Sequence, residues 1–415
     1  MLLGKDEVKI FSAVSTALAL HKGEKIGVAV SGGGDSVGLL HLLHQICRNS
    51  GKTIEAITVD HGLRDGSAAE AEFVKTMCNS IGVRHASVLW AGWKGDGNLQ
   101  NEARRARYRL IADWAISRQL SFVCLGHTEN DVAETFLMRV ARESGVDGLS
   151  RMSADFQKSG MHFLRPLLDV SRSELRSFLR HQNIDWCEDP SNRNEAFERV
   201  RARRALKALD NSGISISALA AVSRNMSQAR DALRAVTHCV SSSLVAQRHG
   251  DLIVQRAGFL AENPEIQRRL LNDILSWISN RAYPVRRAPI ADLMVSIQEQ
   301  RNFSLGGCMV FVGSKEIRIA REYNAVRDLV EYSPMWDRWA IEGPWRVGMA
   351  VRALGEPSLA ILEDWRALQI PRQTLMASPS VWQKDKLLAA PLAQFGQGWQ
   401  ANLINGSFHD ANSPE

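Results

Sequence analysis

The stretch Ile26-Gly-Val-Ala-Val30-Ser31-Gly-Gly-Gly-Asp35-Ser36 decides the fold of the first half of the chain. Its apolar part, Ile26–Val30, predicts a short buried strand, and the residues from about Asp35 to Cys47 predict a helix. Only serine and glycine stand between them. A strand that turns directly into a helix through such a loop is typical of an α/β fold that binds phosphate at the helix N-terminus.

The loop has the residue types that anion binding requires. Gly32, Gly33 and Gly34 let backbone N–H groups approach an anion closely, and Ser31 and Ser36 add hydroxyl donors. The loop is not the Walker pattern, because no lysine follows the glycines, and its spacing is not that of the dinucleotide G-x-G-x-x-G. Taken alone, such a turn can also be an ordinary strand–helix connection.

Strand and helix signals alternate through the first half of the chain. Strands are predicted around 53–59, 86–89 and 122–125, and helices around 67–81, 101–116 and 131–142. This alternation favours a parallel sheet with helices on both faces. The glycine loop, the segment from Asp60 and Gly126-His127 each follow a strand. We therefore expect them to converge on one crevice beyond the carboxyl ends of the strands.

The pattern changes twice further along the chain. From about Ser212 to Gln300 it is mostly helical and rich in arginine, and after about Asn324 prolines and tryptophans predict short strands and turns. Since the chain is too long for one ordinary core, we expect an α/β domain over 1–210, a mostly helical domain over 211–325 and a small mixed α/β domain over 326–415.

The composition is that of a globular protein with a basic bias. A formal net charge of +6 and a pI of about 9.1 favour a polyanionic partner such as nucleic acid. The six cysteines are far apart and form no C-x-x-C pair, which suits reduced thiols in a cytoplasm. The N-terminus predicts an amphipathic helix and no signal peptide, and no apolar run approaches the ~18 residues of a membrane span.

The order S-G-G-x-D-S after a Val-Ala-Val strand resembles the PP-loop of the ATP pyrophosphatase superfamily. This resemblance implies an adenine nucleotide alpha hydrolase-like fold and an enzyme that cleaves ATP between its α- and β-phosphates to adenylate a carbonyl oxygen. It also implies that Ser31–Ser36 bind ATP and that Asp35 orients Mg²⁺ or the incoming nucleophile. The alternative role of Asp35 is structural, as an acid that stabilises the N-terminus of a helix.

Further segments resemble tRNA(Ile)-lysidine synthetases and follow in order from about Lys25 to Arg204. They are Asp60-His-Gly-Leu-Arg64, Asn98-Leu-Gln-Asn-Glu-Ala-Arg104-Arg-Ala-Arg107-Tyr108, Gly126-His-Thr-Glu-Asn-Asp131-Val-Ala-Glu134-Thr135 with Leu137-Met-Arg139, Arg165-Pro-Leu-Leu168, and Asp189-Pro-Ser-Asn192. The chain departs from the family pattern at Gln100, Val132 and Glu143. It also has Asn130 in place of the first of two paired acids, which keeps the shape of the acid and loses its charge.

The resemblance implies a ligase that uses ATP, Mg²⁺, free L-lysine and an isoleucine tRNA with a CAU anticodon. ATP would adenylate the 2-oxo group of the wobble cytidine, and the amine of lysine would then expel AMP and leave lysidine. The codon read would change from AUG to AUA. The helical domain over 211–325 and the small domain over 326–415 would bind the rest of the tRNA, mainly through its phosphates. The reacting base has to leave its stack, because a stacked base hides the reactive atom. The oligomeric state stays open, with a homodimer as one candidate.

Two groups of arginines are candidate contacts to tRNA phosphate. Arg104 and Arg107 are three residues apart and share a helix face. Arg199, Arg201 and Arg203 lie in a denser basic stretch at the end of the first domain. The alternative for both groups is a solvated helix surface with weak ion pairs.

His127 and Asp131 are candidate catalytic residues beside Asp35. His127 could contact phosphate or move a proton, and Asp131 could hold Mg²⁺ or take a proton from an amine. Glu134 is three residues after Asp131 on the same helical face and is a further candidate for Mg²⁺. A lone histidine at such a position often has only a structural role.

Three other functions stay open at this point. A tRNA 2-thiolation enzyme of the same superfamily would attack with sulfur, and Cys124 and Cys187 are the cysteines that could meet for this purpose. A non-catalytic RNA-binding protein would be expected to tolerate changes in the loop, yet Ser31–Ser36 is unbroken. A PP-loop amidase for a small metabolite would leave the basic stretch and the two further domains without a purpose.

Overall fold

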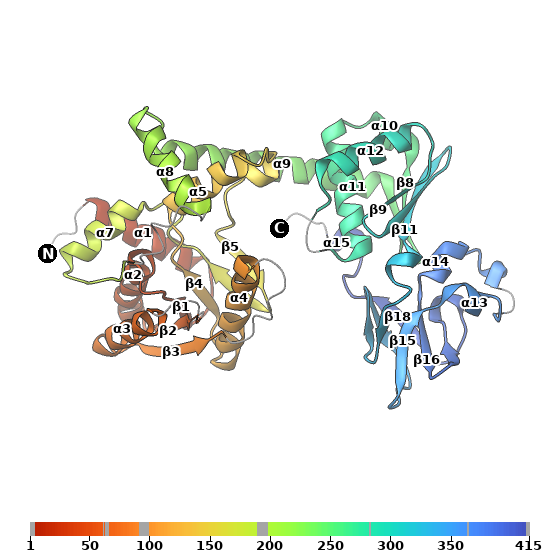
Figure 1. The fold of residues 1–415 in the computed structure, drawn as a ribbon, viewed down its shortest axis with the longest axis horizontal. Helices are drawn as coiled ribbons and strands as arrows, with labels where there is room; N and C mark the ends of the chain where they lie inside the picture. The colour runs from red at the N-terminus through yellow and green to blue at the C-terminus, as the bar shows by residue number, and fades with distance from the viewer. Residues whose placement is uncertain are drawn as a thin grey trace. The chain divides into compact units, whose positions relative to one another are not determined.

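The computed structural model describes residues 5–60, 62, 66–90, 99–188, 198–281, 284–362 and 365–411. The chain divides into two compact units, with the boundary between Arg230 and Asp231 (Figure 1). None of the helices in the described ranges combines the length and the apolar character that crossing a membrane requires.

The described part of the first unit is built on a six-stranded sheet in the order β3-β2-β1-β4-β6-β5. Its strands are β1 (Lys25–Ala29), β2 (Thr53–Asp60), β3 (Arg84–Leu89), β4 (Phe122–Leu125), β5 (Asp155–Lys158) and β6 (Met161–Leu164). Neighbouring strands are parallel except for the antiparallel pair β5–β6. Val28 of β1 lies between Ala56 of β2 and Cys124 of β4, so β1 is a central strand. The expected parallel sheet is confirmed.

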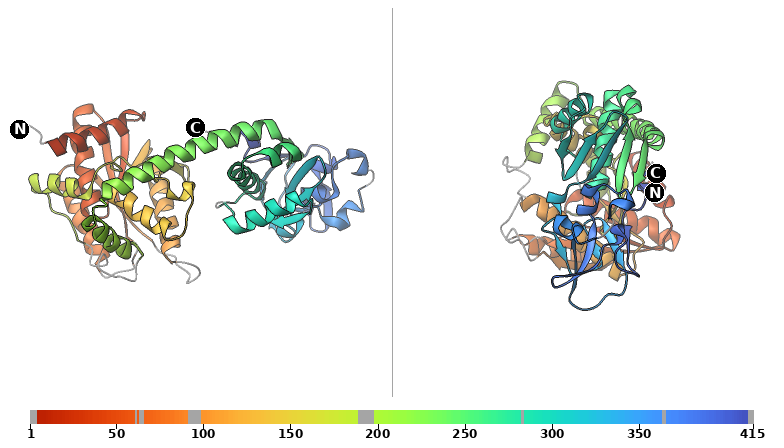
Figure 2. Two further views of the ribbon diagram at one scale, coloured as in Figure 1. Left: turned by 90° about the horizontal axis from the view of Figure 1, so that it is seen from above. Right: turned by 90° about the vertical axis from the view of Figure 1, so that its right-hand side faces the viewer.

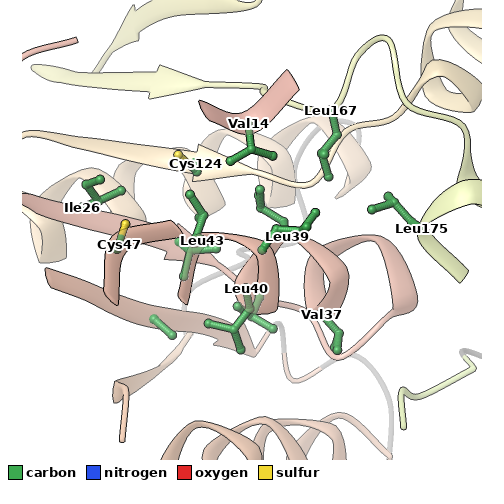
Figure 3. Packing of buried hydrophobic residues seen from close by; sticks show 14 of the residues in the cluster. Val14, Ile26, Val37, Leu39, Leu40, Leu43, Cys47, Cys124, Leu167 and Leu175 are labelled. Atoms are coloured by element: carbon green, nitrogen blue, oxygen red, sulfur yellow. The ribbon is translucent and has the colours of Figure 1, made fainter. Parts of the chain in front are cut away.

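Helices cover both faces of this sheet, as expected (Figure 1). They are α1 (Lys5–Ala19), α2 (Gly34–Ser50), α3 (Ser67–Ser80), α4 (Leu99–Ser117), α5 (Glu129–Val140), α6 (Val146–Leu149), α7 (Arg172–His181) and α8 (Glu198–Asn211). Alternate residues of β1 face opposite sides: Ile26 and Val28 pack with α1, α2 and α7, whereas Ala29 packs with α4. Figure 3 shows Ile26 with Val14 and Leu43 in the hydrophobic core on the side of α1, α2 and α7.

The strand order places a crevice beside the glycine loop. After β1 the chain adds β2 and β3 on one side, and it then returns to add β4 on the other side of β1. Open α/β sheets bind ligands at such a switch point, beyond the carboxyl ends of the two strands. Ser31–Ser36 follows β1 and Gly126-His127 follows β4, so the two segments lie next to each other.

The helix α9 (Ile216–Leu244) carries the chain into the second unit (Figure 2). There α10 (Arg256–Ala261), α11 (Pro264–Ser279) and α12 (Arg287–Gln298) provide the mostly helical character expected for 211–325. A five-stranded antiparallel sheet in the order β7-β8-β11-β10-β9 accompanies them and was not expected. Its strands are β7 (Val245–Arg248), β8 (Asp251–Gln255), β9 (Phe303–Leu305), β10 (Cys308–Val312) and β11 (Glu316–Arg321). Two of these strands precede α10 and three follow α12, so the helices between them dominate the sequence pattern of this stretch.

The remainder of the second unit consists of small sheets, as expected from its prolines and tryptophans. One sheet has the order β12-β15-β16-β17 and the other β13-β14-β18. The elements are β12 (Val330–Glu331), β13 (Met335–Trp336), β14 (Trp339–Glu342), β15 (Met349–Ala353), α13 (Gly355–Leu359), α14 (Arg372–Met376), β16 (Pro379–Gln383), β17 (Lys386–Ala389), β18 (Gln400–Leu403) and α15 (Phe408–Ala411). Trp336 and Trp339 lie in the core between these sheets.

Buried polar contacts tie the two parts of the second unit together. Asp251 accepts hydrogen bonds from Thr374 (2.6 Å) and from Arg318 (3.4 Å), and Arg321 forms a bidentate ion pair with Asp337 (2.9 and 3.0 Å). These contacts bridge the expected boundary at 325/326, which accounts for a single compact unit there. The division into three domains stays a prediction.

Candidate active site

The glycine loop is a tight turn closed by its two serines. Gly32 has φ of +86°, a backbone conformation that L side chains rarely adopt, and Gly33 caps the N-terminus of α2. The hydroxyl of Ser36 donates to the carbonyl of Gly33 (2.9 Å) and accepts from the backbone N–H of Ser31 (3.0 Å). The hydroxyls of Ser31 and Ser36 also lie 3.2 Å apart, so Ser36 helps to shape the loop. Its role in binding ATP stays a prediction. Ser31 is exposed.

Two neighbouring segments form walls around the loop. The backbone N–H of Cys187 donates to the carbonyl of Gly32 (2.9 Å), and the indole of Trp186 lies 3.4 Å from the position of a Cβ on Gly34. On the other side, a Cβ on Gly126 would lie 3.0 Å from the carbonyl oxygen of Asp35. The end of β4 therefore contacts the start of α2 directly, and the expected convergence of the two segments is confirmed.

His127 lies at this contact with a neutral imidazole. Burial, together with the cations Arg165, Arg107 and Arg199, lowers the pKa of His127 to about 3, although Asp131 acts in the opposite direction. Its Nδ1 is buried and has no hydrogen-bond partner in the described part of the chain. At neutral pH, His127 can therefore offer a hydrogen bond to a ligand, but it is a poor proton acceptor.

The three candidate carboxylates meet on one guanidinium that the sequence analysis did not identify. Arg172 Nε lies 2.9 Å from Asp35 Oδ2, Nη1 lies 3.1 Å from Glu134 Oε1, and Nη2 lies 3.5 Å from Asp131 Oδ1. Burial lowers the pKa of Arg172, but the three carboxylates outweigh burial and raise it above its ordinary value. The arrangement draws together the starts of α2, α5 and α7.

The carboxylates respond differently to this guanidinium. Burial raises the pKa of Asp35, and Arg172 only partly offsets this rise. Burial also raises the pKa of Asp131, but Arg172, His127 and the backbone N–H of Thr128 together bring it below its ordinary value. Thr128 donates to Asp131 Oδ2 from its N–H (2.9 Å) and from its hydroxyl (3.0 Å). Asp131 is therefore the more firmly ionised of the two aspartates.

Local sequence explains how Arg172 is held. It is the first residue of α7, where Ser171 and Glu174 form a capping box, a pattern that the sequence S-x-x-E displays. The backbone N–H of Arg172 donates to Oδ1 of Asn130 (2.8 Å). Asn130, a departure from the family pattern, therefore serves the contact between α5 and α7.

The candidate arginines divide into two sets. Arg107 and Arg199 are electrostatic neighbours of His127, and Arg104 is a neighbour of Arg107. Burial lowers the pKa of Arg107, with further lowering by Arg104 and Arg199. Among the described residues, no carboxylate forms an ion pair with Arg107 or Arg199. Asp131 is an electrostatic neighbour of Arg199, but the cations around His127 outnumber the acids, and such an excess indicates a site for an anion.

Arg203 and Arg201 have other surroundings. Arg203 Nε lies 2.7 Å from Glu134 Oε1, so it neutralises that buried carboxylate together with Arg172. Arg201 is exposed on α8, away from the face of Arg199 and Arg203 by the helical repeat. His61, Arg64, Asn98 and the segment 189–192, which contribute to the motifs, lie outside the described residues.

The carboxylates fit Mg²⁺ unequally. Mg²⁺ in nucleotide sites is usually held by one or two carboxylates together with phosphate oxygens. Asp35 fits this role, because its half-buried side chain lies at the loop and Oδ2 alone is engaged by Arg172. Thr128 and Arg172 engage both oxygens of Asp131, and two arginines share Oε1 of Glu134. In the described ranges, no three His, Cys, Asp or Glu side chains form a metal-binding cluster. Metal binding by Asp131 and Glu134 stays a prediction without support from these contacts.

Similarity to known proteins agrees with this site. The PP-loop domain family matches residues 6–209. A tRNA(Ile)-lysidine synthase of Ruegeria pomeroyi is 43% identical over 384 residues, which make up 92% of this chain and 92% of that protein. The chain belongs to the tRNA(Ile)-lysidine synthase family. Proteins of the same name from Wolbachia pipientis wMel (32% identity; 79% of this chain and 78% of that protein) and Hyphomonas neptunium (35%; 69% and 78%) are also similar.

Membership of the tRNA(Ile)-lysidine synthase family confirms the resemblance found in the motifs. It makes the chain an ATP-using ligase with a PP-loop domain. The sulfur-transfer alternative also lacks support in the structure, since Cys124 is fully buried in the core and Cys187 lies at the loop. Burial raises the pKa of Cys124, which disfavours the reactive thiolate.

Proposed function

We propose that the chain joins L-lysine to C2 of the wobble cytidine in an isoleucine tRNA with a CAU anticodon, at the expense of ATP. The observation that carries this proposal is 43% identity across almost the whole of a protein named tRNA(Ile)-lysidine synthase, together with an intact phosphate loop. The product, lysidine, would redirect the tRNA from the codon AUG to AUA.

The first step uses the glycine loop. The oxygen O2 of cytidine attacks the α-phosphorus of ATP and diphosphate leaves. Backbone N–H groups at the N-terminus of α2 lie where they can stabilise the phosphates as charge moves onto the leaving group. Asp35 lies at the same helix end, and we assign it to the triphosphate side of the reaction. Mg²⁺ held by Asp35 would neutralise phosphate charge when bound.

The second step needs the amine of lysine, a destination for its proton and a neutral hydrogen-bond partner for the reacting nucleobase. The lysine nitrogen bonds to C2, and AMP leaves with O2. Asp131 is held ionised by Arg172 and Thr128, so it can attract the protonated amine and orient it. Because its pKa is lowered, the surplus proton leaves to water or to the departing AMP phosphate. In the tautomer that carries a proton on Nδ1, the neutral His127 can donate a hydrogen bond to a phosphate or nucleobase oxygen.

The tRNA is the anion that the unpaired arginines match. We assign Arg104, Arg107 and Arg199 to tRNA phosphate near the reacting nucleotide. Arg107 and Arg199 are neighbours of His127, Arg104 is a neighbour of Arg107, and none of the three forms an ion pair with a carboxylate among the described residues. Contacts of 211–325 and 326–415 with the rest of the tRNA stay a prediction, as does a homodimer. The proposed reaction is consistent with the cytoplasmic location expected from the sequence, because tRNA, ATP and free lysine are all found in the cytoplasm.

Product release tests this function. Purified protein with Mg²⁺, ATP, radiolabelled lysine and a tRNA(Ile) transcript with the CAU anticodon should release AMP and diphosphate in a one-to-one ratio with lysine incorporated. A transcript with the wobble cytidine replaced by uridine is the matched control and should release neither. Lysine incorporation that is equal in both transcripts, or absent from both, would contradict the proposal.

A further inference from the structure

The planar guanidinium of Arg172 contacts the carboxylates of three acidic residues, one on α2 and two on α5. Each of its three nitrogens faces a different carboxylate: Asp35 at 2.9 Å, Glu134 at 3.1 Å and Asp131 at 3.5 Å. The side chain of Arg172 is 19% exposed, and the side chain of Glu134 is only 1% exposed. A lysine ammonium is a compact point charge, and it cannot reproduce a fork that reaches three separate acceptors.

The base of this side chain is fixed by contacts between α5 and α7. Asn130 Oδ1 accepts the backbone N–H of Arg172 (2.8 Å), and the backbone N–H of Glu129 donates to the carbonyl of Val170 (2.9 Å). Asn130 makes no side-chain ion pair, so its effect on the carboxylates passes through Arg172. A substitution that removes the amide oxygen would free the first turn of α7 and loosen the guanidinium with it.

We propose that Arg172 is a positioning residue of the reaction, which holds the carboxylates of Asp35 and Asp131 in one geometry at the phosphate loop, and that Asn130 acts through Arg172. This inference rests on the proposed function only in that Asp35 and Asp131 serve the reaction with ATP and the amine. Arg172 contacts no reacting atom itself. Its contribution is to fix the distance between Asp35 on α2, assigned to the first step, and Asp131 on α5, assigned to the second, because it pairs with both carboxylates.

The consequence is a change in turnover with little change in tRNA binding. Displacing a catalytic group by about 1 Å can cost on the order of a hundredfold in rate. The arginines assigned to tRNA phosphate, Arg104, Arg107 and Arg199, form no hydrogen bond or ion pair with Arg172. Loss of the Arg172 geometry should therefore lower kcat and leave KM for tRNA almost unchanged.

Four variants test the inference: Arg172→Lys, Asn130→Ala, Asn130→Asp and the double variant Arg172→Lys with Asn130→Ala. The control is Arg118→Lys, because Arg118 forms a bidentate pair with Glu55 (2.8 and 3.0 Å) at the opposite end of the sheet. We expect kcat for lysidine formation to fall ~10- to 100-fold in Arg172→Lys and ~3- to 10-fold in Asn130→Ala, with KM for tRNA within about twofold. Asn130→Asp retains an acceptor oxygen at this position, so its kcat should be closer to that of the parent protein than to that of Asn130→Ala.

The double variant separates a positioning role from a merely structural one. If Asn130 acts through Arg172, the double variant should be no slower than Arg172→Lys alone, a non-additive result. If the losses in kcat of the two single variants multiply in the double variant, the inference is overturned. A variant whose melting temperature falls while its kcat does not would also overturn it. Full activity of Arg172→Lys would do the same. If Arg172→Lys does not fold, the comparison of Asn130→Ala with Asn130→Asp still decides, since both keep the arginine: equal activities would overturn the inference. A parent protein that forms no lysidine would contradict the proposed function instead.

Discussion

The backbone of Gly126 touches that of Asp35: a Cβ on Gly126 would lie 3.0 Å from the Asp35 carbonyl oxygen and 3.0 Å from the Cα of Ser36. Both neighbours are backbone atoms, which cannot move aside as a flexible side chain can. This contact joins the end of β4 to the start of α2 at the switch point of the sheet and sets the position of the phosphate loop.

Gly126→Ala should therefore impair the use of ATP. The methyl group would push the end of β4 away from the start of α2, and we expect kcat/KM for ATP to fall by about tenfold or more. Steady-state diphosphate release at varied ATP measures this. Gly66→Ala is the control, because a Cβ at Gly66 meets no atom within 4 Å. Equal activity of the two variants would mean that the contact has no role in the loop.

Asp35→Asn should separate chemistry from tRNA binding. The amide keeps the shape and loses the charge that we assign to the triphosphate, so lysidine formation should fall by about a hundredfold or more. The dissociation constant for tRNA, measured by filter binding, should change by less than about twofold because the arginines are untouched. A variant with parental turnover would remove Asp35 from the mechanism.

His127 should stay neutral across the range in which the enzyme would work. Its pKa of about 3 in the folded chain lies below the ordinary value of 6.5, so the unfolded chain binds the proton first as the pH falls. The stability of the first unit should thus decrease as the pH drops from about 6.5 towards 3, and His127→Gln should reduce this decrease. Thermal melts of parent and variant at pH 7.5 and pH 5 measure it; an unchanged pH dependence would contradict the assigned pKa shift.

Arg199→Gln should weaken tRNA binding mainly through charge. Arg199 forms no ion pair with a carboxylate among the described residues, although Asp131 is an electrostatic neighbour, so its loss should lower the slope of log K against log salt by about one. Arg105→Gln is the matched control, because Arg105 is exposed and pairs with Glu102 on its own helix (2.9 Å). A salt dependence that changes equally in both variants would indicate a general effect of net charge and no specific phosphate contact.

Local sequence was sufficient for much of the first unit and for the loop. The strand at Ile26–Val30 and the following helix could be predicted because apolar runs, glycines and strand–helix spacing act over a few residues. The hydrogen bonds of Ser36 could not, because they depend on the exact turn of the loop. The strands β7 to β11 were not predicted although all except β9 are at least as long as β4, because they lack the regular strand–helix spacing of the first unit and flank the helices α10 to α12.

Arg172 shows what sequence spacing alone could not reveal. Its partner Asp35 is 137 positions away and Glu134 is 38 away, so the cluster exists only once the sheet has brought α2, α5 and α7 together. The capping-box pattern of Ser171 and Glu174 indicates the start of a helix, but it does not indicate which groups the side chain of Arg172 contacts. The role of Asn130 was hidden for the same reason, because its partner is a backbone N–H of another helix.

The most direct test of the account is mass spectrometry of the wobble nucleoside after reaction of the isoleucine tRNA with ATP, Mg²⁺ and lysine. The account predicts that the wobble cytidine gains the mass of one lysine less one water, and that omission of either ATP or lysine prevents this gain. An unmodified cytidine in the complete reaction, or a mass gain that corresponds to exchange of oxygen for sulfur, would contradict it.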